Sequence, residues 1–179
     1  MTFQTTLLGW HDFYSITGMA AASLVGLLFV GLSIHLRLVV SRPDVQALAR
    51  VTLTSFGLVL FVSIFMVIPE TDSSATGWQL VSSGAVACLL IARSVVAGMR
   101  GRERVLGLRR LILRFGFTLL SFAGVIATGG VLLAGDYRRG LGWLVGVAVV
   151  ILVTSLRNVW DLLVTVGAAT LGVQSTDTT

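Results

Sequence analysis

Charged residues are scarce in this chain of 179 residues, and some residue types are almost missing. Only 12% of the residues are charged, about half of the roughly 25% that is usual in a soluble domain. There are two prolines, and all 13 basic residues are arginines. This composition excludes a disordered chain, a nucleic-acid-binding domain with a solvated basic surface, and most soluble enzymes. The mean hydropathy of +0.94 instead indicates an integral membrane protein.

Residues that bind metals or act as nucleophiles are also few. Cys88 is the only cysteine and lies in an apolar run, so one chain forms no disulfide and no cysteine-based metal site. His35 has no second ligand at metal-binding spacing, and an interfacial cap or a hydrogen bond to another helix explains it better. The sequence contains no Ser-His-acid set, glycine-rich phosphate loop or HExxH helix. We therefore expect no catalytic residues, no metal and no cofactor.

Five apolar stretches are long enough to cross a bilayer, whose hydrocarbon core of about 30 Å needs about 20 helical residues. We predict an all-α fold, an integral membrane helical bundle with about five transmembrane helices. It forms a single domain over residues 1–173, followed by a disordered tail at 174–179. The expected spans are 15–36, 51–68, 78–99, 115–134 and 141–160.

The fifth stretch is too long for a single bilayer crossing. It contains no proline from Leu141 to Val173, and as one helix it would measure about 50 Å. We expect a helical extension to residue 173, and the sequence leaves open whether the helix bends after Arg157.

The arginines predict an orientation. The loops after the first and third spans hold nine arginines, whereas the opposite side holds only Arg138 and Arg139. The arginine-rich loops are then cytoplasmic, with the N-terminus outside and the C-terminus inside. An aromatic belt predicted at the outer interface agrees with this orientation. Its members are Trp10, Tyr14, Trp78, Tyr137 and Trp143.

Several polar residues are expected at one depth, near the cytoplasmic edge of the hydrocarbon, where they form a candidate intramembrane cluster. They are His35, Arg93, Arg157, Asn158 and Asp161. Asn158 and Asp161 share a polar helix face, and we expect Arg157 and Asp161 to form a buried pair. The alternative is that the arginines extend to headgroup phosphates, which their long stems allow.

Arginines alternate with Val, Leu and Ile in the segment 100–114, a pattern typical of a basic amphipathic helix on an anionic inner leaflet. We expect lipid-headgroup contacts from Arg100, Arg102, Arg104, Arg109, Arg110 and Arg114. The alternative is that these arginines only hold the loop in the cytoplasm.

Small residues at a spacing of four allow helices to approach closely in a bilayer, where lipid tails are as apolar as leucine. The first span has Gly18, Ala22 and Gly26, and the fifth has Gly142 and Gly146. We expect these faces to pack helices within the chain or to form a homo-oligomer.

The first span also carries a family-like pattern, WHDFY at 10–14 followed by GMAAASLVGLLFVGLSIHL. Two later motifs accompany it, VIP at 67–69 and NVWDLL at 158–163. Together they resemble a widespread group of small bacterial multi-pass membrane proteins, some of which are labelled modulator of FtsH protease. The resemblance implies a bacterial inner (plasma) membrane and a role in regulation or assembly, and it carries over no catalytic residues.

Two classes of function follow. The first is an interaction or regulatory subunit without catalysis, which needs only packing faces and a basic cytoplasmic surface. The second is a small homo-oligomeric ion channel or transporter-like pore with the polar cluster at its cytoplasmic mouth. The expected partners are the bilayer with its anionic headgroups, and a second copy or another membrane protein, but no nucleic acid. The first class is favoured, because no span has a strong polar face through the outer half of the bilayer.

Overall fold

The computed structural model describes residues 3–41, 43–68, 72–100 and 108–176, and these are almost entirely helical. The helices are α1 (Phe3–Leu8), α2 (His11–Ile34), α3 (Leu36–Ser41), α4 (Pro43–Val67), α5 (Ser73–Arg100), α6 (Leu108–Leu133) and α7 (Tyr137–Thr176). Five contain a segment long and apolar enough to cross a membrane: His11–Ile34, Val45–Val67, Ser73–Ser94, Gly116–Leu133 and Tyr137–Val164. The predicted all-α bundle with five helices long and apolar enough to span a membrane is confirmed.

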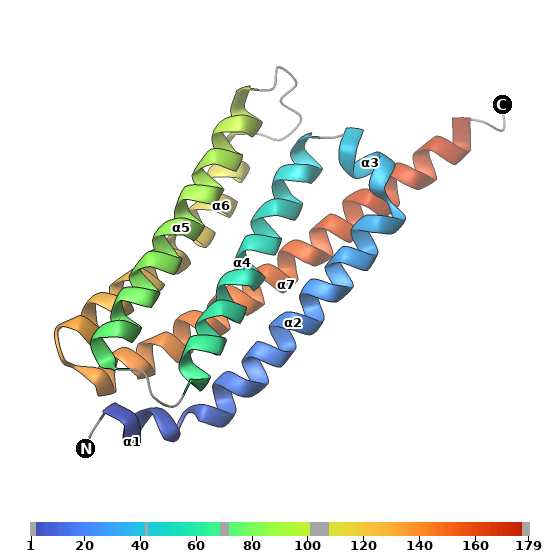
Figure 1. Cartoon of the computed structure of the whole chain (residues 1–179). Coiled ribbons are helices and arrows are strands. Elements are labelled where there is room, and N and C mark those ends of the chain that lie inside the picture. The colour runs from blue at the N-terminus through green and yellow to red at the C-terminus, as the bar shows by residue number, and fades with distance from the viewer. Residues whose placement is uncertain (1–2, 42, 69–71, 101–107, 177–179) are drawn as a thin grey trace.

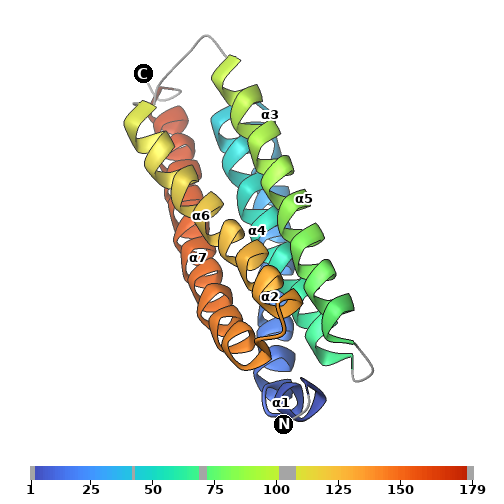
Figure 2. The ribbon, with the colours of Figure 1, turned by 90° about the vertical axis from the view of Figure 1, so that its left-hand side faces the viewer.

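Helix α4 lies at the centre of the bundle (Figure 1). It packs on α2, α5 and α7, while α6 packs on α5 and α7. Helix α7 runs diagonally across the others, from the end of the bundle that carries α1 to the end that carries α3 (Figures 1 and 2). We call these the α1 end and the α3 end. The turn between α6 and α7 lies at the α1 end, close to the N-terminus.

The short helix α1 folds across the α1 end instead of extending α2 (Figure 1). Its apolar side chains Phe3 and Leu7 are buried and belong to the main hydrophobic core. The ring of Phe3 meets that of Tyr137 edge to face, with centroids 5.5 Å apart. This contact joins the start of the chain to the start of α7, so α1 covers the core at this end.

The predicted aromatic belt is only partly present at the α1 end. Trp78 and Trp143 are 64% and 68% exposed, as belt residues should be. Tyr14 is instead completely buried, because it lies on the face of α2 that packs against α4. Tyr14 is therefore a core residue, and its assignment to the belt was wrong.

Two residues fix the turn between α6 and α7. Gly135 has a φ of +89°, a backbone conformation that residues other than glycine rarely adopt. Its amide donates a hydrogen bond to the Leu132 carbonyl at 3.0 Å. The amide of Asp136 donates to the Val131 carbonyl at 3.3 Å, which completes a Schellman motif. The Asp136 carboxylate then accepts a hydrogen bond from the Arg139 amide at 3.4 Å and caps α7.

Helix α7 is continuous over 40 residues and does not break after Arg157. Its buried side chains recur at alternating steps of three and four residues. They are Leu141, Leu144, Ala148, Ile151, Ser155, Asn158 and Leu162. This period of 3.5 keeps one stripe of α7 against its neighbours from Leu141 to Leu162. The last turns of α7 extend past α3 (Figure 1).

Side chains fill the interior of the described bundle. Tyr14, Phe56 and Phe122 are completely buried. Two apolar clusters divide the core. The larger runs from α1 and the α1 end to the middle of the bundle, and the smaller joins α2, α3, α4 and α7 near the α3 end.

Candidate functional site

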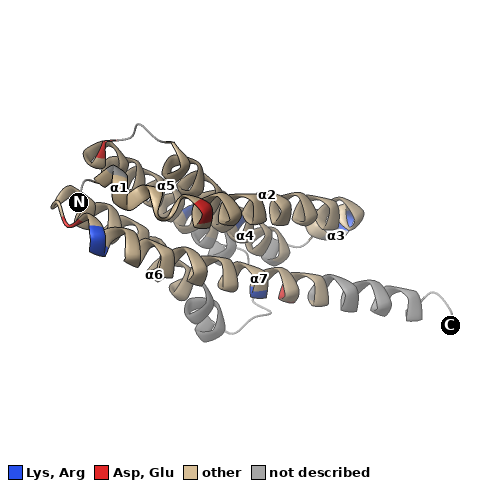
Figure 3. Ribbon diagram, turned by 90° about the horizontal axis from the view of Figure 1, so that it is seen from below, with Lys and Arg blue, Asp and Glu red and all other residues tan. Residues whose placement is uncertain are grey.

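The most polar part of the α7 stripe lies near the α3 end. Beyond its first turn, α7 carries only two charged residues, Arg157 and Asp161 (Figure 3). Asn158 between them is 4% exposed, and Asp161 is half-buried. Neither Asn158 nor Asp161 is without an interaction partner. The protein-facing orientation expected for these two residues therefore agrees with the structure.

The first span meets α7 at this same level. A Cβ placed on Gly31 of α2 would lie 3.9 Å from the side chain of Leu163. One turn after Gly31, His35 ends α2 with non-helical backbone angles, and its carbonyl accepts a hydrogen bond from the Val39 amide at 3.1 Å. His35 is half-buried at the junction of α2 and α3. His35 therefore lies one helical turn after the residue at which α2 meets α7.

The two arginines of the predicted cluster lie elsewhere. Arg93 is exposed on α5, which packs on α4 and α6 rather than along α7. Arg157 is exposed as well, because it lies on the side of α7 opposite the buried stripe. The predicted burial of the Arg157–Asp161 pair is therefore wrong for Arg157, which is exposed. The exposed position suits the alternative, in which the long stem carries the guanidinium to the interface.

The predicted headgroup contacts in the segment 100–114 lie outside the described side chains. The residues concerned are Arg100, Arg102, Arg104, Arg109, Arg110 and Arg114. They stay a prediction.

The small residues named from sequence divide into two groups. Gly18 packs α2 on α4, because a Cβ there would lie 3.0 Å from the Ser63 Cβ. Gly26, Gly142 and Gly146 instead face outward, and a Cβ on any of them would meet nothing within 4 Å. Ala22 is also exposed. The outward glycines therefore leave parts of the surface of α2 and α7 without a partner inside the chain.

Sequence reasoning missed the close approach of α5 and α6. A Cβ on Gly84 would lie 2.7 Å from the side chain of Ile126, and one on Gly77 would lie 2.8 Å from that of Leu133. These glycines let α5 and α6 approach closely. The sequence does contain a signal for this contact, because Gly77 and Gly84 are seven residues apart and so lie on one face of α5. The spacing of four used to select small residues does not include this pair.

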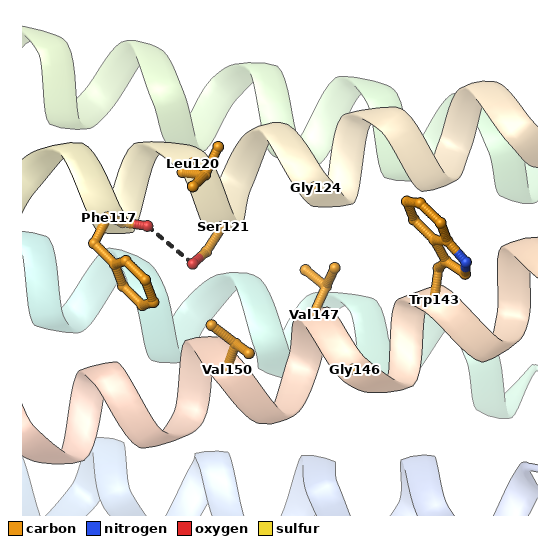
Figure 4. Close-up of a pocket in the computed structure, with 8 residues that line it drawn as sticks. All are labelled: Phe117, Leu120, Ser121, Gly124, Trp143, Gly146, Val147 and Val150. Carbon is orange, nitrogen blue, oxygen red and sulfur yellow. Dashed lines mark hydrogen bonds between the residues drawn. The ribbon is translucent and has the colours of Figure 1, made fainter.

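A groove of about 410 Å³ lies between α6 and α7 (Figure 4). Helix α6 contributes Phe117, Leu120, Ser121 and Gly124, and α7 contributes Trp143, Gly146, Val147 and Val150. The only hydroxyl in the groove is that of Ser121, which donates to the Phe117 carbonyl at 3.0 Å. The groove is therefore apolar in character.

The described residues contain few groups that could bind a metal or react. Among the described residues, no three His, Cys, Asp or Glu side chains come together as metal ligands would. Within the same part of the chain, three buried polar atoms lack a hydrogen-bond partner, namely the Tyr14 hydroxyl, Ser63 Oγ and Gln79 Oε1. They lie on α2, α4 and α5, towards the α1 end.

These features define a class, an all-α bundle of five helices long and apolar enough to span a membrane, with a packed interior and polar groups near its ends. Comparisons with known protein families, with curated proteins and with solved structures give no match.

Proposed function

We propose that this chain is a multi-pass subunit of a bacterial inner (plasma) membrane that acts by binding another membrane protein. Its role is regulatory, in assembly or in modulation of a membrane protease, and it performs no catalysis of its own. The observation that carries the proposal is the projection of α7. Helix α7 has 40 residues, which is about 60 Å of helix, whereas the hydrocarbon core of a bilayer is about 30 Å thick.

A projecting helix suits a contact with a partner. Counted from Tyr137, about 20 helical residues cross the core, so the turns of α7 that follow can extend beyond it. Near the start of this projection, Trp160 and Val164 are 67% and 54% exposed, so the outward side of α7 is apolar where it leaves the bundle. An apolar surface that neither the rest of the chain nor the hydrocarbon core covers is typical of an interaction site.

The packed interior supports a binding role more than a pore within one chain. The middle of the described bundle is occupied by large side chains such as Phe56 and Phe122. A conducting path would therefore need an axis between several copies.

The proposed orientation has the α1 end outside and the α3 end in the cytoplasm. Arg37 and Arg50 lie towards the α3 end, and Arg138 and Arg139 at the α1 end. The complete sequence gives nine arginines against two, which favours a cytoplasmic α3 end. The projection of α7 then reaches into the cytoplasm.

Site-specific photocrosslinking in cells tests this proposal. A photoreactive residue at Trp160 should give one adduct of defined mass, while the same residue at Leu89 should not. Leu89 is a matched control, because it is 59% exposed on α5. Equal adducts from both positions would contradict a specific contact by α7.

Reconstitution separates the binding role from the pore. Liposomes that contain the purified protein should show no conductance. Reproducible conductance that Asp161→Asn alters would overturn the proposal in favour of a channel.

A further inference from the structure

The short helix α3 begins where α2 ends. Helix α2 has 24 residues, or about 36 Å of helix, which is slightly more than the hydrocarbon core of about 30 Å. Helix α3 follows after one residue and turns away from the axis of α2 towards the start of α4 (Figure 1). Helix α3 therefore begins near one face of the membrane.

Two contacts fix α3 on the end of the bundle. Before it, His35 leaves the helical conformation with a φ of −112° and a ψ of 29°. Val39 is 8% exposed and belongs to the same apolar cluster as Val45 of α4. The side-chain amide of Gln46 donates a hydrogen bond to the Val40 carbonyl at 3.1 Å, and so satisfies one of the carbonyls that a helix end leaves unpaired. The rotation of α3 about its own axis is therefore set by the bundle.

The other side chains of α3 divide into an apolar and a polar face. Successive residues of a helix are about 100° apart, so Leu36 and Val40 lie on one side, and Arg37 and Ser41 lie on the next. Leu36 and Val40 are 59% and 63% exposed, and Arg37 and Ser41 are exposed as well. Around the axis, the buried Val39 is thus followed by an exposed apolar face and then by an exposed polar face. This order is typical of a helix that lies in a membrane interface.

We propose that α3 lies along the membrane surface, with Leu36 and Val40 among the acyl chains and the guanidinium of Arg37 at lipid phosphates. The exposed apolar surface adjoins that of α2, whose last residue Ile34 is 71% exposed. Arg37 makes no ion pair within the described part of the chain, and its charge is opposite to that of a phosphate. The inference rests on the membrane location in the proposed function, but not on the binding of another protein.

A protein partner fits this face less well than lipid does. A specific protein interface uses about 20–30 residues on each side. Helix α3 has six residues, and one of its sides already packs on the bundle. Acyl chains and headgroups need no such area. Because α3 joins α2 to α4, a surface-bound α3 sets the depth of both spans in the bilayer.

Spin labels measure the depth of each face. Single cysteines are placed at positions 36, 37, 40 and 41 in a Cys88→Ala background, and the full chain is reconstituted in vesicles of phosphatidylcholine and phosphatidylglycerol. Oxygen concentrates among acyl chains and a nickel chelate stays in water, so the ratio of their collision rates with a label reports its depth. We expect this oxygen-to-nickel ratio to be severalfold higher at 36 and 40 than at 37 and 41. A ratio that falls steadily from 36 to 41 would mean that α3 points out of the membrane, and would overturn the proposal.

Two further labels separate this inference from the proposed function. Leu27, 67% exposed within α2, calibrates lipid, and the exposed Asp72 calibrates water. A label at Leu27 that contacts water would overturn the membrane location and the proposed function with it. A label at Leu27 in lipid, together with water contact at Leu36 and Val40, would overturn the placement of α3 alone. Low access of both reagents to Leu36 and Val40 would show that protein covers this face, and would also overturn it.

A charge reversal tests the contact with phosphate. With the label at Val40, Arg37→Glu should raise the access of nickel severalfold, because anionic lipid headgroups repel the new carboxylate. Arg93→Glu is the matched control, because Arg93 is an exposed arginine of α5, and it should leave access at Val40 unchanged. Far-UV circular dichroism establishes that both variants are folded. Equal access of nickel in Arg37→Glu and in the unsubstituted chain would overturn the contact of Arg37 with phosphates.

Discussion

A Cβ atom on Gly129 would lie 2.8 Å from the backbone carbonyl oxygen of Gly77, so α5 and α6 touch backbone to backbone. Gly130, the next residue, has nothing within 4 Å of an added Cβ and serves as a matched control. Gly129→Ala should force the helices apart at a cost of about 1–3 kcal/mol. This exceeds the gain of about 0.5–1 kcal/mol from replacing glycine in a helix.

Thermal unfolding in detergent, followed by circular dichroism, therefore should show a lower Tm for Gly129→Ala and an equal or higher Tm for Gly130→Ala. Equal shifts for the two variants would mean that α5 and α6 are not in backbone contact.

The edge-to-face pair of Phe3 and Tyr137 should contribute to stability across the α1 end. A double-mutant cycle with Phe3→Ala and Tyr137→Ala should give a coupling of about 0.5–1.5 kcal/mol in the free energy of unfolding. Leu8→Ala is the control, because Leu8 is 66% exposed on the same short helix. Strictly additive effects of the two substitutions would refute the docking of α1.

Removal of the Tyr14 hydroxyl should not destabilise the protein. The ring is completely buried, but its hydroxyl has no hydrogen-bond partner in the described part of the chain. Tyr14→Phe should therefore be as stable as the wild type or more stable, by up to about 1 kcal/mol. Tyr14→Ala should lose about 3–5 kcal/mol, because it leaves a cavity. A loss above about 1 kcal/mol for Tyr14→Phe would indicate a buried water bound to the hydroxyl.

Neighbouring residues of α7 should differ sharply in their effect on stability. Asn158→Ala should cost about 1–3 kcal/mol, because it leaves a buried group without its partner. Arg157→Ala should stay within about 0.5 kcal/mol, since that side chain is exposed. Unfolding of the single variants and of Arg157→Ala combined with Asp161→Ala measures the coupling directly, and we expect at most about 0.5 kcal/mol. A larger coupling free energy between Arg157 and Asp161 would support the buried pair predicted from sequence.

Cysteine labelling in a Cys88→Ala background tests the proposed orientation. Asp72 and Arg37 are both exposed, the former at the α1 end and the latter at the α3 end. An impermeant maleimide added to intact cells should label Asp72→Cys, whereas Arg37→Cys should react only after the membrane is opened. The reverse pattern would place the N-terminus inside.

Local sequence predicted those features of the site that depend on one helix. The spacing of Asn158 and Asp161 was enough to place them on the protein-facing side, because the helical period fixes which residues share a face. The same spacing did not predict that Arg157 is exposed. Two residues four apart lie near each other, but only the packing of α7 on α4 decides which of them is covered.

Composition and apolar run length by themselves determined the all-α class and the five spans, because a helix of about 20 apolar residues is what a bilayer requires. Tertiary structure decided which glycines pack, because Gly77, Gly129 and Gly146 differ only in what stands opposite them. Tertiary structure also decided that Tyr14 is buried. An aromatic residue near a helix end can lie at the membrane interface or in the core, and here the packing of α2 on α4 places it in the core. Such choices depend on contacts between residues distant in sequence, and no local period encodes them.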